Sequence, residues 1–283
     1  MSARFGPAGN AADFPYKTSE RAPAWIAAQG LDCYEYQCGK GVHIGEESAR
    51  RIGAAAELAG IVLSLHAPYF INLANPDPDS RQKTIGYITA ACRAADWMGA
   101  RRVVIHSGAL MGRTRRQAME IALPALSAVL AACDDAGFGH IALCPETMGK
   151  INQLGDLDEV LELCGLDERL IPCVDFGHLY ARSLGWEDGE EAMARILDKI
   201  AAALGQERAS RFHSHFSHIE FTPKGGEKCH RTFEDDGGYG PDWTPLARQV
   251  AARGWSPTFI CESAGTQARD AAEMKRIYQG LLP

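Results

Sequence analysis

The chain has 283 residues, of which 46% are hydrophobic and 23% are charged, and its formal net charge is −7. This profile is typical of a soluble globular protein and excludes a low-complexity chain. The negative charge argues against a nucleic-acid partner, because phosphate binding needs a basic face, although bound divalent cations would offset it. The N-terminus shows no secretory signal, so we expect a cytoplasmic monomer with no membrane partner.

Short apolar runs alternate with segments of helical periodicity along the chain. In chain order, the apolar runs predict strands at residues 4–6, 33–37, 62–66, 102–106, 141–146, 171–175, 211–216 and 258–262. Between them, apolar residues recur at offsets of three and four, as in Ile85, Ile88 and Cys92, which indicates amphipathic helices. The nine cysteines include no C-x-x-C pair, so we expect buried reduced thiols.

Eight strand–helix alternations predict an α/β fold, a (β/α)8 TIM barrel, as a single domain over residues 1–283. The alternative is a doubly wound open sheet, which should carry a glycine-rich phosphate loop after its first strand. Residues 6–10 read Gly-Pro-Ala-Gly-Asn and lack that spacing. The longest irregular segment, residues 222–243, follows the seventh strand and is expected as a loop over the mouth of the barrel.

Six predicted strands end in a side chain that can bind a metal. These residues are His66, His106, Glu146, Asp175, His213 and Glu262. The C-terminal ends of parallel strands converge on one mouth of a barrel, so we expect the six in one cluster. Three carboxylates at one mouth would repel one another, and no Lys or Arg lies at the same strand ends to offset them. Metal ions would supply that charge.

Three further features favour a metal centre. Asp175 and His178 form a D-x-x-H element at the end of the sixth strand. His213 and His215 lie on the same side of their strand, because side chains alternate with period two. The segment 222–243 carries Glu227 and His230, which could fold onto the mouth.

The segment 66–74, His-Ala-Pro-Tyr-Phe-Ile-Asn-Leu-Ala, resembles the signature of the endonuclease IV family of apurinic/apyrimidinic endonucleases, within the xylose-isomerase-like TIM barrels. The order of the candidate ligands resembles that family from about residue 4 to residue 280. The resemblance implies a zinc site whose ions are held in three groups: His66, His106 and Glu146; Glu146, Asp175, His213 and Glu262; and His178 with His230. It also implies that Glu146 bridges two ions and that Glu262 orients the attacking water, which makes both catalytic.

The third group departs from the family pattern. Lys228 stands two residues before His230, where the family has an aspartate. Glu227, or else His215, would have to complete the third ion. The stretch after His213 also lacks the His-x-Asn-Asp element of the repair enzymes, which places this chain in a divergent branch.

The resemblance extends to contact with DNA. Family members insert a tyrosine and a bulky apolar residue into the duplex, and Tyr69 and Phe70 occupy those positions as substrate-binding candidates. The family's arginine-bearing loop after the second strand corresponds to residues 37–41, which contain no arginine. Arg113, Arg115 and Arg116 follow the fourth strand and could instead meet phosphate.

We therefore expect a zinc-dependent phosphodiesterase resembling endonuclease IV. It would hold two or three Zn²⁺ ions and hydrolyse a phosphodiester at abasic sites in damaged DNA or in a related phosphate substrate. One alternative is a sugar isomerase or epimerase that uses a single divalent ion. Mg²⁺ or Mn²⁺ is less favoured than zinc in this chain, because the candidate ligands are rich in histidine. Another is a non-catalytic, metal-dependent binding protein. A small phosphorylated or sugar molecule is the alternative partner to DNA.

Overall fold

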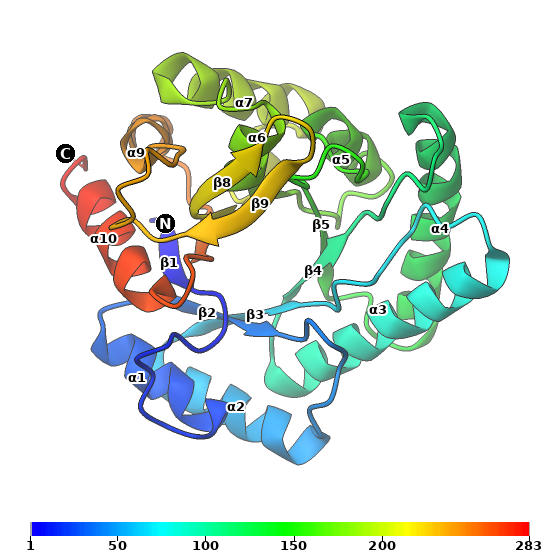
Figure 1. Ribbon diagram of the computed structural model, residues 1–283. Coiled ribbons are helices and arrows are strands. Elements are labelled where there is room, and N and C mark those ends of the chain that lie inside the picture. Colours follow the sequence, from blue (N-terminus) through cyan, green and yellow to red (C-terminus); the bar gives the residue numbers. More distant parts are fainter. Residues whose placement is uncertain (1, 283) are drawn as a thin grey trace.

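The computed structural model describes residues 2–282. Eight parallel strands form one sheet in the order β1-β10-β7-β6-β5-β4-β3-β2. A parallel bridge between Ala8 and Glu35 brings the two edge strands together and closes the sheet into a barrel. Helices surround this barrel, as Figure 1 shows in a view onto its mouth. The predicted (β/α)8 barrel is confirmed.

The barrel strands match the predicted runs closely. They are β1 (Arg4–Pro7), β2 (Cys33–Gln37), β3 (Val62–His66), β4 (Arg102–His106), β5 (Ala142–Glu146), β6 (Cys173–Asp175), β7 (His213–Phe216) and β10 (Thr258–Cys261). The main outer helices are α1 (Ala22–Ala28), α2 (Glu46–Ala59), α3 (Pro78–Met98), α4 (Arg115–Asp135), α5 (Leu157–Cys164), α7 (Gly189–Leu204), α9 (Trp243–Arg253) and α10 (Gln267–Gln279). Shorter helices are η1 (Ser19–Arg21), α6 (Phe176–Arg182) and α8 (Gln206–Ala209).

Local sequence explains where the helices begin and end. Asp77 caps α3 by accepting from the Ser80 amide, and Gly99 ends it with a φ of 72°. Thr114 and Gln117 form a reciprocal capping box at the start of α4. These caps satisfy backbone groups that would otherwise be left without partners at the helix ends.

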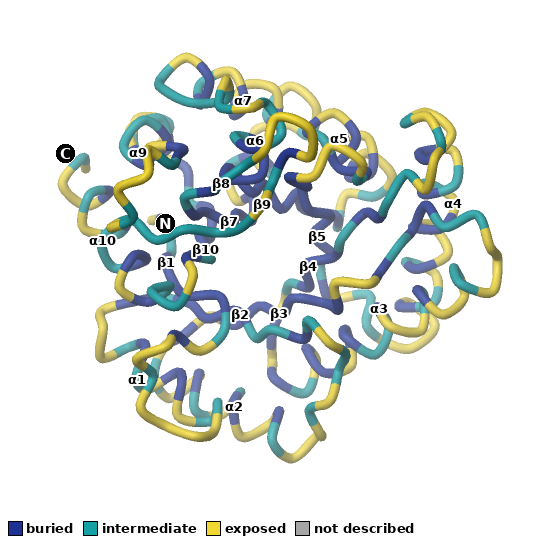
Figure 2. Tube along the Cα trace, viewed as in Figure 1, coloured by how far each residue is buried: buried dark blue, intermediate teal, exposed yellow. Residues whose placement is uncertain are grey.

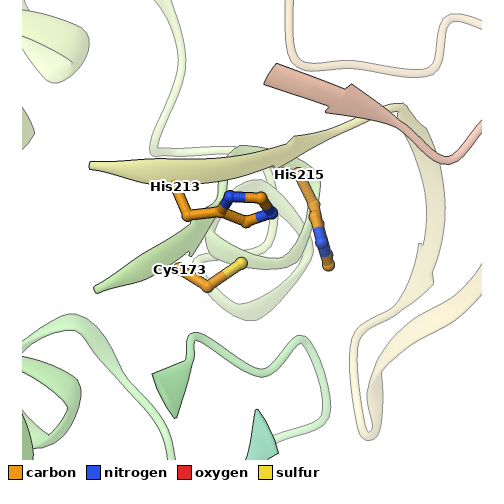
Figure 3. A group of neighbouring side chains, drawn as sticks. All are labelled: Cys173, His213 and His215. Carbon is orange, nitrogen blue, oxygen red and sulfur yellow. The ribbon is translucent and has the colours of Figure 1, made fainter. Parts of the chain in front are cut away.

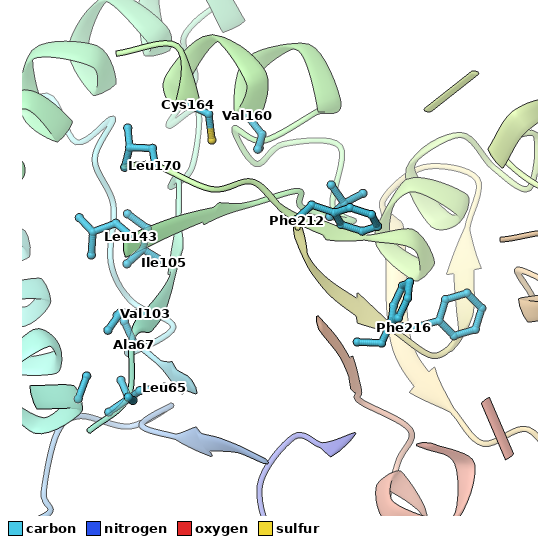
Figure 4. Close-up of a cluster of buried hydrophobic side chains, with 14 of the residues drawn as sticks. Leu65, Ala67, Val103, Ile105, Leu143, Val160, Cys164, Leu170, Phe212 and Phe216 are labelled. Carbon is cyan, nitrogen blue, oxygen red and sulfur yellow. The ribbon is translucent and has the colours of Figure 1, made fainter. Parts of the chain in front are cut away.

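The main apolar core lies between the strands and the helices. Figure 4 shows part of it, where Leu65, Ile105 and Leu143 of the strands pack outward, with Val160 and Cys164 of α5 nearby. Burying each large aliphatic side chain contributes roughly 1.5–3 kcal/mol. Figure 2 shows the buried chain concentrated at the centre, with exposed positions on the outer helices. The nine cysteines are free thiols, and eight of them are buried.

By length and composition, α4 could cross a membrane, with a mean hydropathy of 1.2. The core helix of a soluble protein passes the same test. Here Ala118, Ala122, Leu126 and Val129 of α4 are fully buried within the main core. Its apolar character is therefore accounted for by packing against the barrel.

The segment expected as an irregular loop after β7 begins instead with a β-hairpin. Strands β8 (His218–Thr222) and β9 (Gly226–Arg231) pair antiparallel, so the prediction for residues 222–231 is corrected. Gly226 makes the turn possible, because its φ is +73° and a Cβ there would lie 2.3 Å from the Gly149 carbonyl oxygen. The hairpin lies across the mouth in Figure 1, docked on the loop after β5.

Candidate metal centre

The ends of β3, β4 and β5 bring two histidines onto one carboxylate. Glu146 is 1% exposed, and its Oε2 lies 3.3 Å from His66 Nε2 and 3.2 Å from His106 Nε2. Strand register explains this meeting, because His106 pairs with Glu146 between β4 and β5. The structure thus brings together the residues expected around the first ion.

A second group shares Glu146. Ligand atoms of Glu146, Asp175, His215 and Glu262 lie within 4.8 Å of one another. His215 Nδ1 lies 3.0 Å from Glu146 Oε1 and 3.6 Å from Glu262 Oε2. Glu146 therefore faces both groups, as the bridging role requires.

His213 does not take the place expected for it in this second group. Both His213 and His215 point into the barrel, but β7 pairs His215 with Asp175 and pairs His213 with Cys173, one layer deeper. His213 Nε2 instead lies 2.9 Å from Glu35 Oε2. The prediction is corrected: His215 occupies the position at the mouth, because that position is set by the register between β6 and β7.

A third group contains His178, Glu227 and His230, whose ligand atoms also lie within 4.8 Å of one another. His178 Nε2 is 3.5 Å from Glu227 Oε2, so Glu227, rather than His215, stands with these histidines. Residues 227 and 230 would face opposite sides of a regular strand. A bulge shifts the register of β9 at Lys228, so both face the mouth. Lys228 points to Glu220, with Nζ 2.5 Å from its Oε1.

Three histidines carry a hydrogen bond that fixes the imidazole. Nδ1 of His66 donates to the Ala67 carbonyl oxygen at 2.7 Å, and Nδ1 of His178 donates to the Thr147 carbonyl oxygen at 2.8 Å. Nδ1 of His230 lies 2.8 Å from the Ser217 hydroxyl. With Nδ1 engaged, Nε2 is left facing the carboxylates. Histidines that bind metals are usually held in this way.

Asp175 provides a direct test of whether these residues fit a cation. Its Oδ1 caps α6 by accepting from the His178 amide at 2.7 Å, but its buried Oδ2 has no hydrogen-bond donor. A buried carboxylate oxygen without a partner is costly. Because Asp175 belongs to the group that includes Glu146 and Glu262, a metal ion held there could satisfy this oxygen. The residues fit a metal centre.

The electrostatics of the centre are strongly coupled. Burial raises the pKa of Glu146, but His215, His106 and His66 outweigh it and hold the pKa well below its usual range. Burial lowers the pKa of His178, but Asp175 and Glu227 outweigh that effect and raise it to about 9. Without metal, the carboxylates therefore favour the protonated imidazole of His178.

Sequence reasoning missed Glu35, which lies in the middle of β2 and is fully buried. Its carboxylate receives a hydrogen bond from Ser64 Oγ at 2.9 Å and contacts His213 and His215. A glutamate in the middle of a predicted barrel strand was the available signal. Its partners lie on β3 and β7, and only the closed barrel brings them together.

A pocket of about 460 Å³ opens onto the centre and is lined by members of all three groups, together with Tyr69 and Lys150. The Tyr69 ring stacks on His106 with centroids 5.8 Å apart. A Cβ on Gly39 would lie 2.2 Å from that ring, so the tyrosine depends on this glycine. Phe70 is 52% exposed, but it packs on Tyr87 of α3 and is not among the pocket-lining residues.

Two of the three arginines after β4, Arg115 and Arg116, are engaged in ion pairs, whereas Arg113 Nη1 donates to the Met111 carbonyl oxygen at 3.3 Å. Arg115 binds Glu159, and its Nε lies 3.2 Å from Asp156 Oδ2. Arg116 pairs with Glu120 at 3.2 Å. These pairs anchor the start of α4 and leave Lys150 as the cation that lines the pocket among the residues the structure describes.

Comparison with known proteins places the chain among barrels of several activities. An uncharacterised protein of Methanocaldococcus jannaschii is 30% identical over 89% of this chain and 88% of its own length. A probable endonuclease 4 of Mycoplasma pneumoniae is 30% identical over 48% of each chain. The chain spans about half the length of the probable endonuclease 4 relatives it matches.

Solved structures show the same fold. A D-tagatose 3-epimerase-like protein superposes with a TM-score of 0.72 at 19% identity, over 98% of this chain and 96% of that one. Endonuclease IV from Thermus thermophilus superposes with a TM-score of 0.67 at 18% identity, over 98% of both chains. The family model for xylose isomerase-like TIM barrels matches residues 23–278, so the chain belongs to the xylose isomerase-like TIM barrel family.

Proposed function

We propose that the protein is a zinc-dependent phosphodiesterase that acts at abasic sites in DNA or on a related phosphate substrate. The observation that carries this proposal is the sharing of Glu146: its two oxygens face His66 and His106 on one side and His215 on the other. A carboxylate placed between two groups of candidate ligands suits two adjacent ions. The similarity to probable endonuclease 4 proteins supports the same reading.

Zinc is the metal that the donor set favours. Imidazole nitrogens outnumber carboxylates in the first and third groups, whereas the second group has one imidazole, that of His215, and three carboxylates. Imidazole suits zinc better than the harder ions Mg²⁺ and Mn²⁺, which prefer oxygen. His66, His106 and Glu146 would hold one ion, Glu146 with Asp175, His215 and Glu262 a second, and His178, Glu227 and His230 a third. Bound zinc would supply Lewis acidity at the phosphate oxygens.

The chain's own residues would position the reactants. Glu262 reaches the pocket with its side chain 16% exposed, so Oε2 could accept a proton from the attacking water. The Tyr69 ring could stack against a base or sugar at the rim of the pocket, and Lys150 could pair with a phosphate beyond the metal centre. The β8–β9 hairpin covers one side of the pocket and limits access of water.

A sugar epimerase is the second candidate, because the pocket of about 460 Å³ suits a small molecule. The epimerase-like structure shares only the fold with this chain and does not add support for an epimerase function. The two candidates separate by assay. The zinc-loaded protein should cleave a duplex oligonucleotide containing an abasic-site analogue and should release nitrophenol from bis(p-nitrophenyl) phosphate. Epimerisation of a ketohexose without phosphodiester cleavage would favour the second candidate.

A further inference from the structure

A carboxylate lies directly behind the metal centre. Glu35 is 0% exposed, and its Oε1 lies 2.9 Å from Nε2 of His215. The other nitrogen of the same imidazole, Nδ1, lies 3.0 Å from Glu146 at the mouth. The His215 ring therefore stands between two carboxylates, one inside the candidate centre and one behind it.

The two nitrogens of His215 have different tasks in this arrangement. A neutral imidazole carries its proton on one nitrogen and offers a lone pair on the other. If Glu35 accepts the proton from Nε2, the lone pair of Nδ1 faces Glu146 and Glu262. A carboxylate behind a metal-binding histidine fixes the tautomer and ring orientation in this way.

Three further side chains hold Glu35. Gln37 Nε2 donates to Oε1 at 3.2 Å. Ser64 Oγ donates to Oε2 at 2.9 Å, and Nε2 of His213 approaches the same oxygen at 2.9 Å. His213 Nδ1 lies 3.5 Å from Nη1 of Arg102, a donor, so the proton of His213 belongs on Nε2, where it can be donated to Glu35. Arg102 thus sets the proton of His213 on Nε2, and the contacts from His213 and His215 both converge on Glu35 as the acceptor.

A metal held between Cys173, His213 and His215 is the rival reading of the same residues. Their ligand atoms lie within 4.8 Å of one another, and Figure 3 shows the three side chains grouped on β6 and β7, where Cys173 and His213 are the first residues of their strands. Glu35, however, already lies 2.9 Å from Nε2 of each imidazole. Nε2 of His213 is hydrogen-bonded to Glu35, whereas Nε2 of His215 has its 2.9 Å contact without hydrogen-bond alignment. A deep ion would have to displace Glu35 from both nitrogens, and the geometry therefore favours a supporting role for Glu35 over a deep metal site.

We propose that Glu35 is a positioning residue of the metal centre, which holds the proton on Nε2 of His215 and so presents Nδ1 to a metal ion. His213 and Ser64 would act one step further back, by fixing Glu35. This inference rests on the proposed metal centre, but it does not depend on which substrate the protein cleaves.

The test is zinc binding by the purified full-length protein, measured by competition with a chromogenic chelator. Glu35→Gln keeps the shape of the side chain but replaces one acceptor oxygen with an amide donor. We expect the affinity for one zinc ion to fall about 10–100-fold, as for other carboxylates behind metal-binding histidines. Glu57→Gln, the same change on the exposed face of α2, should leave the affinity unchanged. Wild-type affinity in a folded Glu35→Gln protein would overturn the proposal.

Two histidine variants separate support from ligation. His215→Gln should lose one zinc ion per chain, whereas His213→Gln should keep the wild-type stoichiometry with a weaker affinity. Equal losses of one ion in both variants would show that His213 is a ligand and would contradict the supporting role. In the zinc-loaded wild type, nitrogen-15 NMR should place the His215 proton on Nε2. In Glu35→Gln the signal of that proton should change; if Glu35 had only a structural role, the proton would stay on Nε2 as in the wild type.

Ser64→Ala covers the case in which Glu35→Gln does not fold. It removes one hydrogen bond to Glu35 and should weaken zinc binding in the same direction but by less; unchanged affinity would count against the proposal. These experiments measure zinc binding alone, so their results do not depend on whether the proposed phosphodiesterase activity is correct. Normal zinc binding by the wild type without phosphodiester cleavage would reject the activity and leave the role of Glu35 intact.

Discussion

His178, in the first turn of α6, faces Glu227 on the β8–β9 hairpin, with Nε2 and Oε2 3.5 Å apart. Glu227→Ala should therefore lose one zinc ion per chain and loosen the hairpin, because the remaining histidines of the group would lack a carboxylate. Anomalous scattering at the zinc edge should show three peaks in the wild type and two in the variant.

The neighbouring residue provides a matched control for Glu227. Lys228 has a side chain that is 55% exposed, and it points to Glu220, away from the centre. Lys228→Ala should keep every zinc peak. Three peaks in Glu227→Ala, with Glu227 distant from all of them in the wild type, would show that this carboxylate is not a ligand.

Glu146→Gln should remove activity while leaving the barrel folded. Glu146 faces two groups of candidate ligands, so its loss should disturb both, whereas the barrel packs through strand interiors and helices. We expect turnover of bis(p-nitrophenyl) phosphate to fall by roughly 10²-fold or more, the cost of misplacing reacting groups. Glu120→Gln on the exposed face of α4 should match the wild type. Full zinc content and turnover in Glu146→Gln would refute the bridging role.

Zinc uptake should release a proton from His178. In the metal-free protein, burial lowers the pKa of this imidazole, but Asp175 and Glu227 outweigh it and raise the pKa to about 9. Below pH 9 the proton must leave before zinc binds, so affinity at this group should weaken about tenfold for each pH unit lost. Above pH 9 that dependence should disappear.

Calorimetry in buffers of different ionisation enthalpy measures the protons released. At pH 7, His178→Gln should release one proton fewer than the wild type when zinc is added. Identical proton release in the two proteins at pH 7 would mean that the imidazole is already neutral there.

The sequence was sufficient for the strands and for most of the strand-end residues, because apolar runs and the polar residues that follow them are local patterns. The depth at which a side chain lies in the barrel is not set by a local pattern. Period two places His213 and His215 on the same side, and only the pairing of Asp175 with His215 shows which one reaches the mouth. Glu35 acquires its partners through closure of the barrel. The bulge that turns Glu227 and His230 to one face depends on pairing with β8. The sequence of β9 contains no pattern that predicts this pairing.

Tyr69 and Phe70 distinguish a nucleic-acid substrate from a small one. Both are more than half exposed, but Tyr69 lines the pocket whereas Phe70 lies on Tyr87 of α3. A duplex could extend beyond the pocket and reach both rings, while a small phosphodiester would contact only Tyr69. Loss of a base-stacking ring costs about 1–3 kcal/mol, which is roughly 5- to 150-fold in Kd.

Phe70→Ala should therefore weaken binding of an abasic-site duplex by that factor and leave the KM for bis(p-nitrophenyl) phosphate unchanged. Tyr69→Ala should weaken binding of the duplex and raise the KM for bis(p-nitrophenyl) phosphate, because the Tyr69 ring packs against His106 beside the metal centre. Tyr87→Ala is the control for indirect effects, since it removes the support beneath Phe70 without touching the pocket lining. Duplex affinity that is unaffected by Phe70→Ala, together with a strong effect of Tyr69→Ala on the small substrate, would identify a small phosphorylated molecule, rather than DNA, as the substrate class.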